Sequence, residues 1–175
     1  RPLVFQEAYY AVEYMEDLLL DHYAGSTQGG NIEQLLTNII GDREKVDLLV
    51  SHMDRVEVAA DKALFEQGQH DTGLFVLEQG SMTALIRIEN DGLKRVKKFR
   101  PGALIGELSA YTPERKRTAT VVANEDSVLY HLSAESLARL DAENLKLAAS
   151  IHELVARTLG GRIGYMNRRL FLELG

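Results

Sequence analysis

The sequence contains no cysteine, and this absence excludes disulfide bonds and metal sites built on cysteine. It also lacks an excess of basic residues, since its formal net charge is −6, so we expect no direct binding to nucleic acid. No apolar run approaches the roughly 20 residues that cross a bilayer. Hydrophobic residues make up 45% and charged residues 26%, which is the balance of a globular domain.

Patterns typical of metal sites and of hydrolase nucleophiles are missing as well. The five histidines are scattered and include no His-x-His pair: His22, His52, His70, His131 and His152. His152-Glu153 begins like a zinc-protease helix, but Ala156 stands where the second histidine is needed. Ser109 follows Leu108 and does not lie between two glycines, as a nucleophile elbow requires. We therefore expect no metal and no enzymatic activity.

The N-terminal region has helical periodicity. Apolar residues at three- and four-residue spacing predict a helix over residues 1–23, and the glycine-rich segment 24–30 is predicted to be a linker. Two shorter patterns, Ile32–Ile40 and Glu44–His52, predict further helices. Because the chain begins at Arg1 without a methionine, we expect it to be part of a longer polypeptide.

Between about residues 56 and 132 the period changes to that of strands. Residues Met82–Ile88 alternate in polarity, and Asn90–Gly92 is a hairpin-turn signal before a returning strand that starts near Val96 and Phe99. Other strands are predicted at Leu74–Leu77, Thr118–Ala123 and Ser127–Leu132. Short strands punctuated by glycine predict an antiparallel sandwich or barrel.

The C-terminal region is again helical. Ser133 is a suitable N-cap for a helix over Ala134–Leu140, and a long helix is predicted from about Ala142 to Leu172, interrupted at Gly160-Gly161. The long helix has one apolar face, formed by Leu147, Ile151, Leu154, Val155, Ile163, Met166 and Leu170. This face must cover the strands, a second copy of the chain in a homodimer, or a bound ligand.

The stretch around Gly106 and Arg117 carries the chemistry. Glu107–Ala110 is predicted to form one helical turn after a strand at Leu104-Ile105, and unpaired amides at such a turn favour an anion. Arg117 is predicted to be partly buried at the start of a strand. Its planar guanidinium group suits phosphate oxygens. Glu107 can accept a hydrogen bond from a sugar hydroxyl. The helical turn, Arg117 and Glu107 together predict a site for a sugar phosphate. Alternatively, Glu107 and Arg117 pair with each other.

Residues 64–140 resemble the cyclic nucleotide-binding domain family. Phe65–Gly68 and Leu74–Gly80 are similar to the first half of that family's β-roll. Pro101–Ala110 is similar to its phosphate-binding cassette, and Arg117–Ala119 to the end of the cassette. The resemblance implies an α+β fold that is mainly β.

That fold would be an antiparallel β-roll of the jelly-roll kind, with N-terminal helices and a long C-terminal helix. It would occupy residues 31–175, with the β-roll over about 56–132 and the C-terminal helices over 133–172.

The resemblance also implies a ligand, cyclic AMP (cAMP) or cyclic GMP (cGMP), and roles for particular residues. Glu107 would accept from the ribose 2′-hydroxyl, and Arg117 would pair with the cyclic phosphate. The amides of Ser109 and Thr118 would contact the same phosphate, and the Thr118 hydroxyl can also meet the 2-amino group of guanine. The implied ligand-binding set is Gly106, Glu107, Leu108, Ser109, Arg117, Thr118 and Ala119. The loop Tyr111–Lys116 is more charged than is common in the family.

A further resemblance concerns the attached protein. Val4–Glu7 and Ala11–Asp17 resemble the last helix of a STAS domain, and residues 129–149 resemble the tail of SulP-type transporters. This implies a cytoplasmic regulatory sensor, joined to the transporter and STAS portion of the same polypeptide and controlling a membrane anion transporter of the sulfate type.

Other functions stay open at this stage. The chain could be the sensor half of a catabolite-activator-like transcription factor, or a degenerate β-roll used only for protein interaction, although Glu107 and Arg117 argue against the latter. Tyr165 and Arg168 are expected to form a lid that closes over the purine, with Gly160-Gly161 as the bend.

Overall fold

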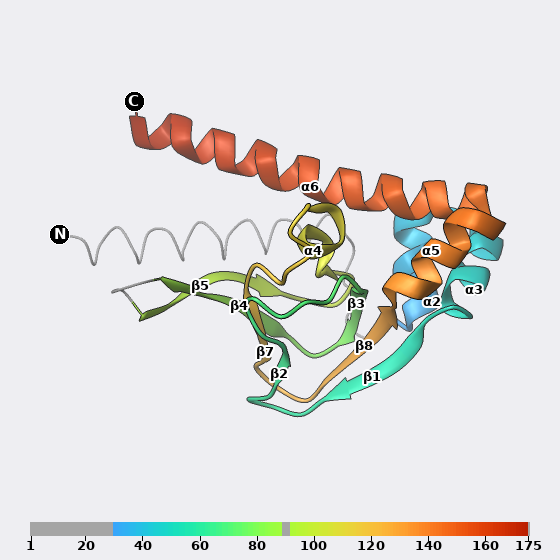
Figure 1. Cartoon of the computed structure of the whole chain (residues 1–175), viewed down its shortest axis with the longest axis horizontal. Helices are drawn as coiled ribbons and strands as arrows, with labels where there is room; N and C mark the ends of the chain where they lie inside the picture. Colours follow the sequence, from blue (N-terminus) through green and yellow to red (C-terminus); the bar gives the residue numbers. More distant parts are fainter. Residues whose placement is uncertain (1–29, 89–91, 175) are drawn as a thin grey trace. The chain divides into compact units, whose positions relative to one another are not determined.

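A computed structural model of the chain describes residues 30–88 and 92–174, with side chains as far as residue 164 apart from residue 162 (Figure 1). The predicted helix over residues 1–23, nearly all of the predicted linker, and the turn residues Asn90 and Asp91 lie outside this range. The described helices are α2 (Ile32–Ile40), α3 (Arg43–Val50), α4 (Glu107–Tyr111), α5 (Ala134–Glu143) and α6 (Leu145–Leu174). The strands are β1 (Asp54–Val58), β2 (Ala63–Phe65), β3 (Leu74–Gln79), β4 (Met82–Ile88), β5 (Gly92–Phe99), β6 (Leu104–Ile105), β7 (Thr120–Ala123) and β8 (Ser127–Leu132).

The strands form two four-stranded antiparallel sheets, as the sequence predicted. One has the order β1-β8-β3-β6 and the other the order β2-β7-β4-β5. A core of apolar side chains lies between them, with Phe75 and Leu77 from the first sheet and Met82 and Val121 from the second. The chain therefore has an α+β fold that is mainly β.

Strand β3 is buried on both of its faces. Since successive side chains of a strand point to opposite sides, Phe75 and Leu77 join the core between the sheets, while Leu74 and Val76 join a second core. This explains why the sequence pattern here is a continuous apolar run without alternation.

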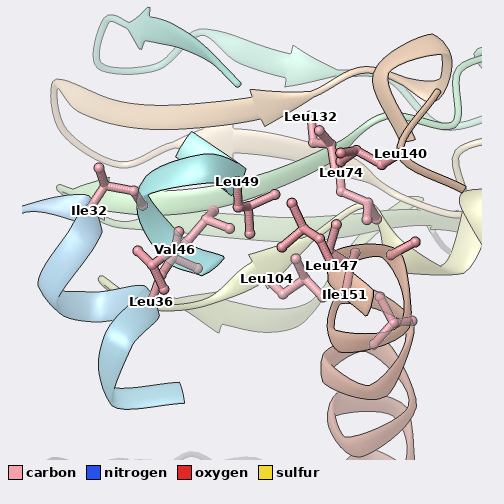
Figure 2. Close-up of a cluster of buried hydrophobic side chains, with 13 residues drawn as sticks. Ile32, Leu36, Val46, Leu49, Leu74, Leu104, Leu132, Leu140, Leu147 and Ile151 are labelled. Atoms are coloured by element: carbon pink, nitrogen blue, oxygen red, sulfur yellow. The ribbon is translucent and has the colours of Figure 1, made fainter. Parts of the chain in front are cut away.

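The second core joins the helices to the outer face of the β1-β8-β3-β6 sheet. Figure 2 shows its side chains, which include Ile32 and Leu36 from α2, Val46 and Leu49 from α3, Leu140 from α5, and Leu147 and Ile151 from α6. They meet the strand residues Leu74, Leu104 and Leu132. The helices that precede and follow the β-roll in sequence thus share one apolar cluster.

Side-chain caps set several helix boundaries close to those predicted. The Asn31 side chain accepts from Gln34 N at 3.1 Å to begin α2, and the Ser133 hydroxyl accepts from Ser136 N at 3.0 Å to begin α5. The first amide of α2, on Ile32, donates to the buried carboxylate of Glu78 on β3 at 2.8 Å. This bond fixes the start of α2 to the sheet.

Three predictions about element boundaries were wrong. The long helix begins at Leu145 and not near Ala142, because the N–H of Asn144 closes α5 on Leu140 O and its side chain accepts from Leu147 N to open α6. The returning strand begins at Gly92, ahead of Val96, and pairs antiparallel with β4, with a register shift between Ala84 and Leu85. Strand β7 begins at Thr120, so Arg117 precedes the strand instead of opening it.

The prediction that Gly160-Gly161 interrupts the long helix was also wrong. Helix α6 runs unbroken through both glycines, and no atom lies within 4 Å of the Cβ that either would carry. The predicted apolar face is buried at Leu147, Ile151 and Val155, but Ile163 is 59% exposed. Met166 and Leu170 lie beyond the described side chains. Over the described residues, no helix combines the length and hydropathy needed to cross a membrane.

The helix–sheet core predicts a position-dependent effect within the first turn of α6. Leu147 is 1% exposed and Leu145 is 73% exposed. Leu147→Ala should lower the free energy of unfolding by about 2–5 kcal/mol, because it removes buried methyl groups and leaves a cavity. Leu145→Ala, the matched control, should change it by less than about 0.5 kcal/mol. Urea unfolding followed by circular dichroism measures both, and equal losses would contradict the assigned burial.

Candidate functional site

The site begins where β6 ends. Strand β6 pairs with β3 and leads into Gly106, which has φ +91° and precedes the short helix α4. A Cβ at position 106 would lie 2.3 Å from Arg117 Nη1 and 2.9 Å from Gly73 O. Glycine is therefore required here both for the backbone conformation and for the close approach of Arg117.

Arg117 is 2% exposed and lies against Gly106 and α4. Its Nη1 donates to Ser109 Oγ at 2.9 Å and to Gly106 O at 3.2 Å. Its Nη2 donates to a carboxylate oxygen of Asp71 in a short ion pair. The guanidinium therefore joins the cassette helix to the loop that precedes β3.

Aromatic rings cover one side of the same guanidinium. Its carbon lies 4.1 Å from the ring centre of Phe65 and 5.4 Å from that of Phe75. The backbone of Arg117 is fixed too, because its N–H donates to Gln69 O at 2.9 Å and its carbonyl accepts from Gly68 N at 2.8 Å. These bonds hold Arg117 outside the β7 ladder, which is why the strand starts three residues later.

One nitrogen of the Arg117 guanidinium has no acceptor in the described part of the chain. Among the described residues, Arg117 Nε is buried and has no hydrogen-bond partner. A buried guanidinium N–H without an acceptor costs free energy, and an oxygen-rich anion would supply the missing acceptor.

The structure brings some of the predicted site residues together and separates others. Gly106, Ser109 and Arg117 are in direct contact, and Glu107 is buried at the first position of α4. The ion-pair partner of Arg117 is Asp71, so the alternative in which Arg117 pairs with Glu107 is not what the structure has.

The other predicted residues lie around this group. Leu108 and Thr118 are exposed, and Ala119 packs at the edge of the core between the sheets. The side chains of Tyr165 and Arg168, the predicted lid, lie outside the described side chains.

Asp71 was missed by sequence reasoning. Burial works to raise the pKa of Asp71, but the N–H of Gly73 and the guanidinium of Arg117 outweigh it and hold the pKa below its usual value. Asp71 is therefore ionised at neutral pH and balances the charge of Arg117. Nothing in the spacing of residues 71 and 117 indicates this pairing.

His131 was also missed. Its ring stacks on Phe75 with a centroid distance of 4.4 Å, packs against Gly73, and its buried Nε2 has no hydrogen-bond partner among the described residues. Burial lowers the pKa of His131, and the charge of Arg117 adds to this, although the carboxylates of Asp71 and Asp54 act in the opposite direction. The ring is therefore neutral at neutral pH.

The described part of the chain contains no cluster of three or more histidine and acidic side chains that could hold a metal ion. A cavity of about 290 Å³ lies apart from Arg117, between α2, β3 and α6, with Leu36, Val76 and Leu154 in its lining.

Comparison with known proteins identifies the family. A model of the cyclic nucleotide-binding domain family matches residues 55–144, just over half of the chain. The chain therefore belongs to the cyclic nucleotide-binding domain family. The match includes β1 to β8, Gly106, α4 and Arg117. No match was found among curated proteins.

Solved structures share the fold. A cyclic nucleotide-binding domain from Methylobacillus flagellatus matches with a TM-score of 0.74 and 23% identity, over 81% of this chain and 83% of that one. The catabolite activator protein of Thermus thermophilus matches with a TM-score of 0.57 and 28% identity, over 75% and 57%. A cAMP-bound PfPKA-R structure matches with a TM-score of 0.55 and 20% identity, over 66% and 42%. The chain thus spans about half the length of the last two proteins.

The environment of His131 predicts a pH-dependent stability. Its folded-state pKa lies below the unfolded value of about 6.5, so the unfolded chain takes up the proton more readily. The stability that the neutral ring contributes is present above about pH 6.5 and is lost as the pH falls through the folded-state pKa.

Between about pH 7.5 and pH 5.5, the free energy of unfolding of the wild type should therefore fall more steeply than that of His131→Phe, which keeps a ring that cannot titrate. Urea titrations at several pH values measure both slopes. Tyr130→Phe, one residue away, should keep the wild-type slope, and equal slopes for wild type and His131→Phe would contradict the assignment.

Proposed function

We propose that this domain binds cAMP or cGMP and acts as a regulatory sensor for the polypeptide to which it is joined. The observation that carries the proposal is the buried guanidinium of Arg117, set against Gly106 and α4, whose Nε has no partner among residues 30–88 and 92–174. Membership of the family supports a cyclic nucleotide as the ligand.

The phosphate would be recognised by charge and by hydrogen bonds. Arg117 offers N–H donors in a planar fork, and the amides at the start of α4, including that of Ser109, add further donors. In the structure, Asp71 balances the charge of Arg117. A phosphate could accept from Nε, which has no partner among the described residues, and any bond to Nη1 or Nη2 would compete with Gly106 O, Ser109 Oγ or Asp71.

The sugar would be recognised by Glu107. A carboxylate accepts hydrogen bonds and a ribose hydroxyl donates one, so the two are complementary. Glu107 is 2% exposed and follows Gly106 directly, which keeps it next to the phosphate-binding group. Its burial means that a nucleotide reaches it only when the residues that cover the site give way.

The attached protein is proposed from the sequence resemblance. SulP-type transporters carry a STAS domain and a cyclic nucleotide-binding domain in series, and on this proposal the domain lies in the cytoplasm and controls anion transport. A transcription factor is the second candidate, supported by the 28% identity to the Thermus catabolite activator protein. The full-length reading frame decides between them, since the first requires membrane spans and the second a helix-turn-helix.

The lid remains a proposal as well. Tyr165 and Arg168 lie on the distal part of α6, and an aromatic ring and a guanidinium can both stack on a purine. Because α6 is continuous through Gly160-Gly161, closure would move this part of the helix without a preformed bend.

The role of Arg117 is tested by calorimetric titration with cAMP and cGMP. Arg117→Ala should weaken binding by about 2–5 kcal/mol, because it removes the charged partner of the phosphate. Arg117→Lys, which keeps the charge but loses the fork, should also bind more weakly than the wild type and decides the matter if the alanine variant does not fold. Lys116→Ala removes a neighbouring exposed charge and should bind nearly as the wild type does. Unchanged affinity in a folded Arg117 variant would refute the proposal.

The choice of base is tested at Thr118. Thr118 is exposed next to Arg117, so its hydroxyl is free to meet a base. Thr118→Ala should weaken cGMP binding by roughly 0.5–1.5 kcal/mol and leave cAMP binding nearly unchanged, since only guanine offers the 2-amino donor. Thr118→Ser, which keeps the hydroxyl, serves as the control. Equal losses for the two nucleotides would show that Thr118 does not read the base.

A further inference from the structure

His131 on β8 lies next to the ion pair of Arg117 and Asp71. Across the sheet, His131 pairs with Asp54 on β1 and with Phe75 on β3. Its ring stacks on that of Phe75 with centroids 4.4 Å apart. The guanidinium carbon of Arg117 lies 5.4 Å from the centre of the same Phe75 ring. A single aromatic ring therefore adjoins both His131 and the guanidinium.

The loop before β3 brings Asp71 to the same place. Gly73 lies so close to the His131 ring that a Cβ at position 73 would be 2.2 Å from His131 Nε2. Asp71 Oδ1 accepts from Gly73 N at 3.0 Å, while Asp71 Oδ2 accepts from Arg117 Nη2. The carboxylate that balances Arg117 is therefore held, through Gly73, beside the imidazole of His131.

Charged side chains from three other segments surround the His131 ring: Asp54 on β1, Asp71 in the loop before β3, and Arg117 ahead of β7. The neighbour on β3 is the uncharged ring of Phe75. His131 Nε2 is buried and has no hydrogen-bond partner among the described residues. Burial and the charge of Arg117 lower the pKa of His131, and the two carboxylates offset them only in part. The protonation of this ring therefore depends on the sum of the charges around Arg117.

A cyclic phosphate at Arg117 would change that sum. A cyclic phosphodiester carries one negative charge, which attracts an imidazolium ring and offsets the repulsion that Arg117 exerts on it. Protonation of His131 would therefore be easier when the site is occupied than when it is empty. Because linkage is reciprocal, a protonated His131 must strengthen nucleotide binding by the same factor.

We propose that His131 couples the site to pH, in that its protonation strengthens the binding of cAMP or cGMP and binding is accompanied by proton uptake. On this proposal His131 does not touch the phosphate and acts on it by charge, across the ring of Phe75. The inference rests on the proposed function, because it needs a nucleotide at Arg117. It also differs in sign from the effect on stability, since acidification lowers the stability of the folded domain and raises its affinity.

The first measurement compares affinities by calorimetric titration of the whole 175-residue chain with cAMP and cGMP. His131→Phe keeps a ring against Phe75 but cannot take up a proton, so it should bind as the wild type does at about pH 7.5. Between about pH 7.5 and pH 5, the affinity of the wild type relative to that of His131→Phe should rise roughly two- to tenfold, as for one partly screened pair of charges. His131→Gln gives the same comparison if the phenylalanine variant does not fold.

The second measurement counts protons. Titrations at about pH 5.5 in two buffers that differ in ionisation enthalpy give the number of protons taken up on binding. The wild type should take up a fraction of one proton more than His131→Phe does. His52→Gln removes a histidine that follows α3 and bonds to Leu48 O, and it should take up as many protons as the wild type.

The outcomes separate the two proposals. If the wild type binds neither nucleotide at any pH, the proposed function fails and the proton coupling fails with it. If the wild type binds, but its affinity relative to His131→Phe stays constant or falls on acidification, the coupling alone is overturned. Equal proton uptake by the wild type and His131→Phe would overturn it as well.

Discussion

The guanidinium of Arg117 lies in the interior with an aromatic ring on one side, a carboxylate at one nitrogen, and the oxygens of Gly106 and Ser109 at another. A buried charge is stable only when its partners are held close to it. Removing one partner leaves an uncompensated charge in the interior, which lowers the stability of the fold. The partners come from β2, β3, the loop before β3, and α4. The relative positions of these segments are therefore constrained by one side chain, whose charge is balanced by Asp71.

Much of the fold was predictable because local rules and long-range packing agree. The alternating polarity of Met82–Ile88, the cap at Ser133 and the single helical turn after Gly106 each follow from short-range chemistry, and the structure has all three. Boundaries failed where one residue serves two elements, as Asn144 does. A predicted boundary was also wrong where the backbone is bonded to residues distant in sequence. At Arg117 the backbone bonds to Gly68 and Gln69, and Arg117 therefore lies outside β7.

The candidate site was predictable only in part, and the reason is similar. Gly106, Glu107, Ser109 and Arg117 lie within one continuous stretch, so their proximity can be argued from spacing. Asp71, Phe65 and Phe75 reach Arg117, and His131 reaches Phe75, through the pairing of strands that are distant in sequence, and no spacing of these residue types reveals it.

The joint at Asn144 has a mechanical consequence. The N–H of Asn144 closes α5 and its side chain opens α6, so this single residue separates the two helices. A rotation of one helix is therefore passed to the other. Helix α6 has 30 residues and is therefore about 45 Å long. A tilt of about 10° at its start would carry its far end through roughly 8 Å. A change of this size in the angle between α5 and α6 would thus displace the far end of α6 by much more than its start.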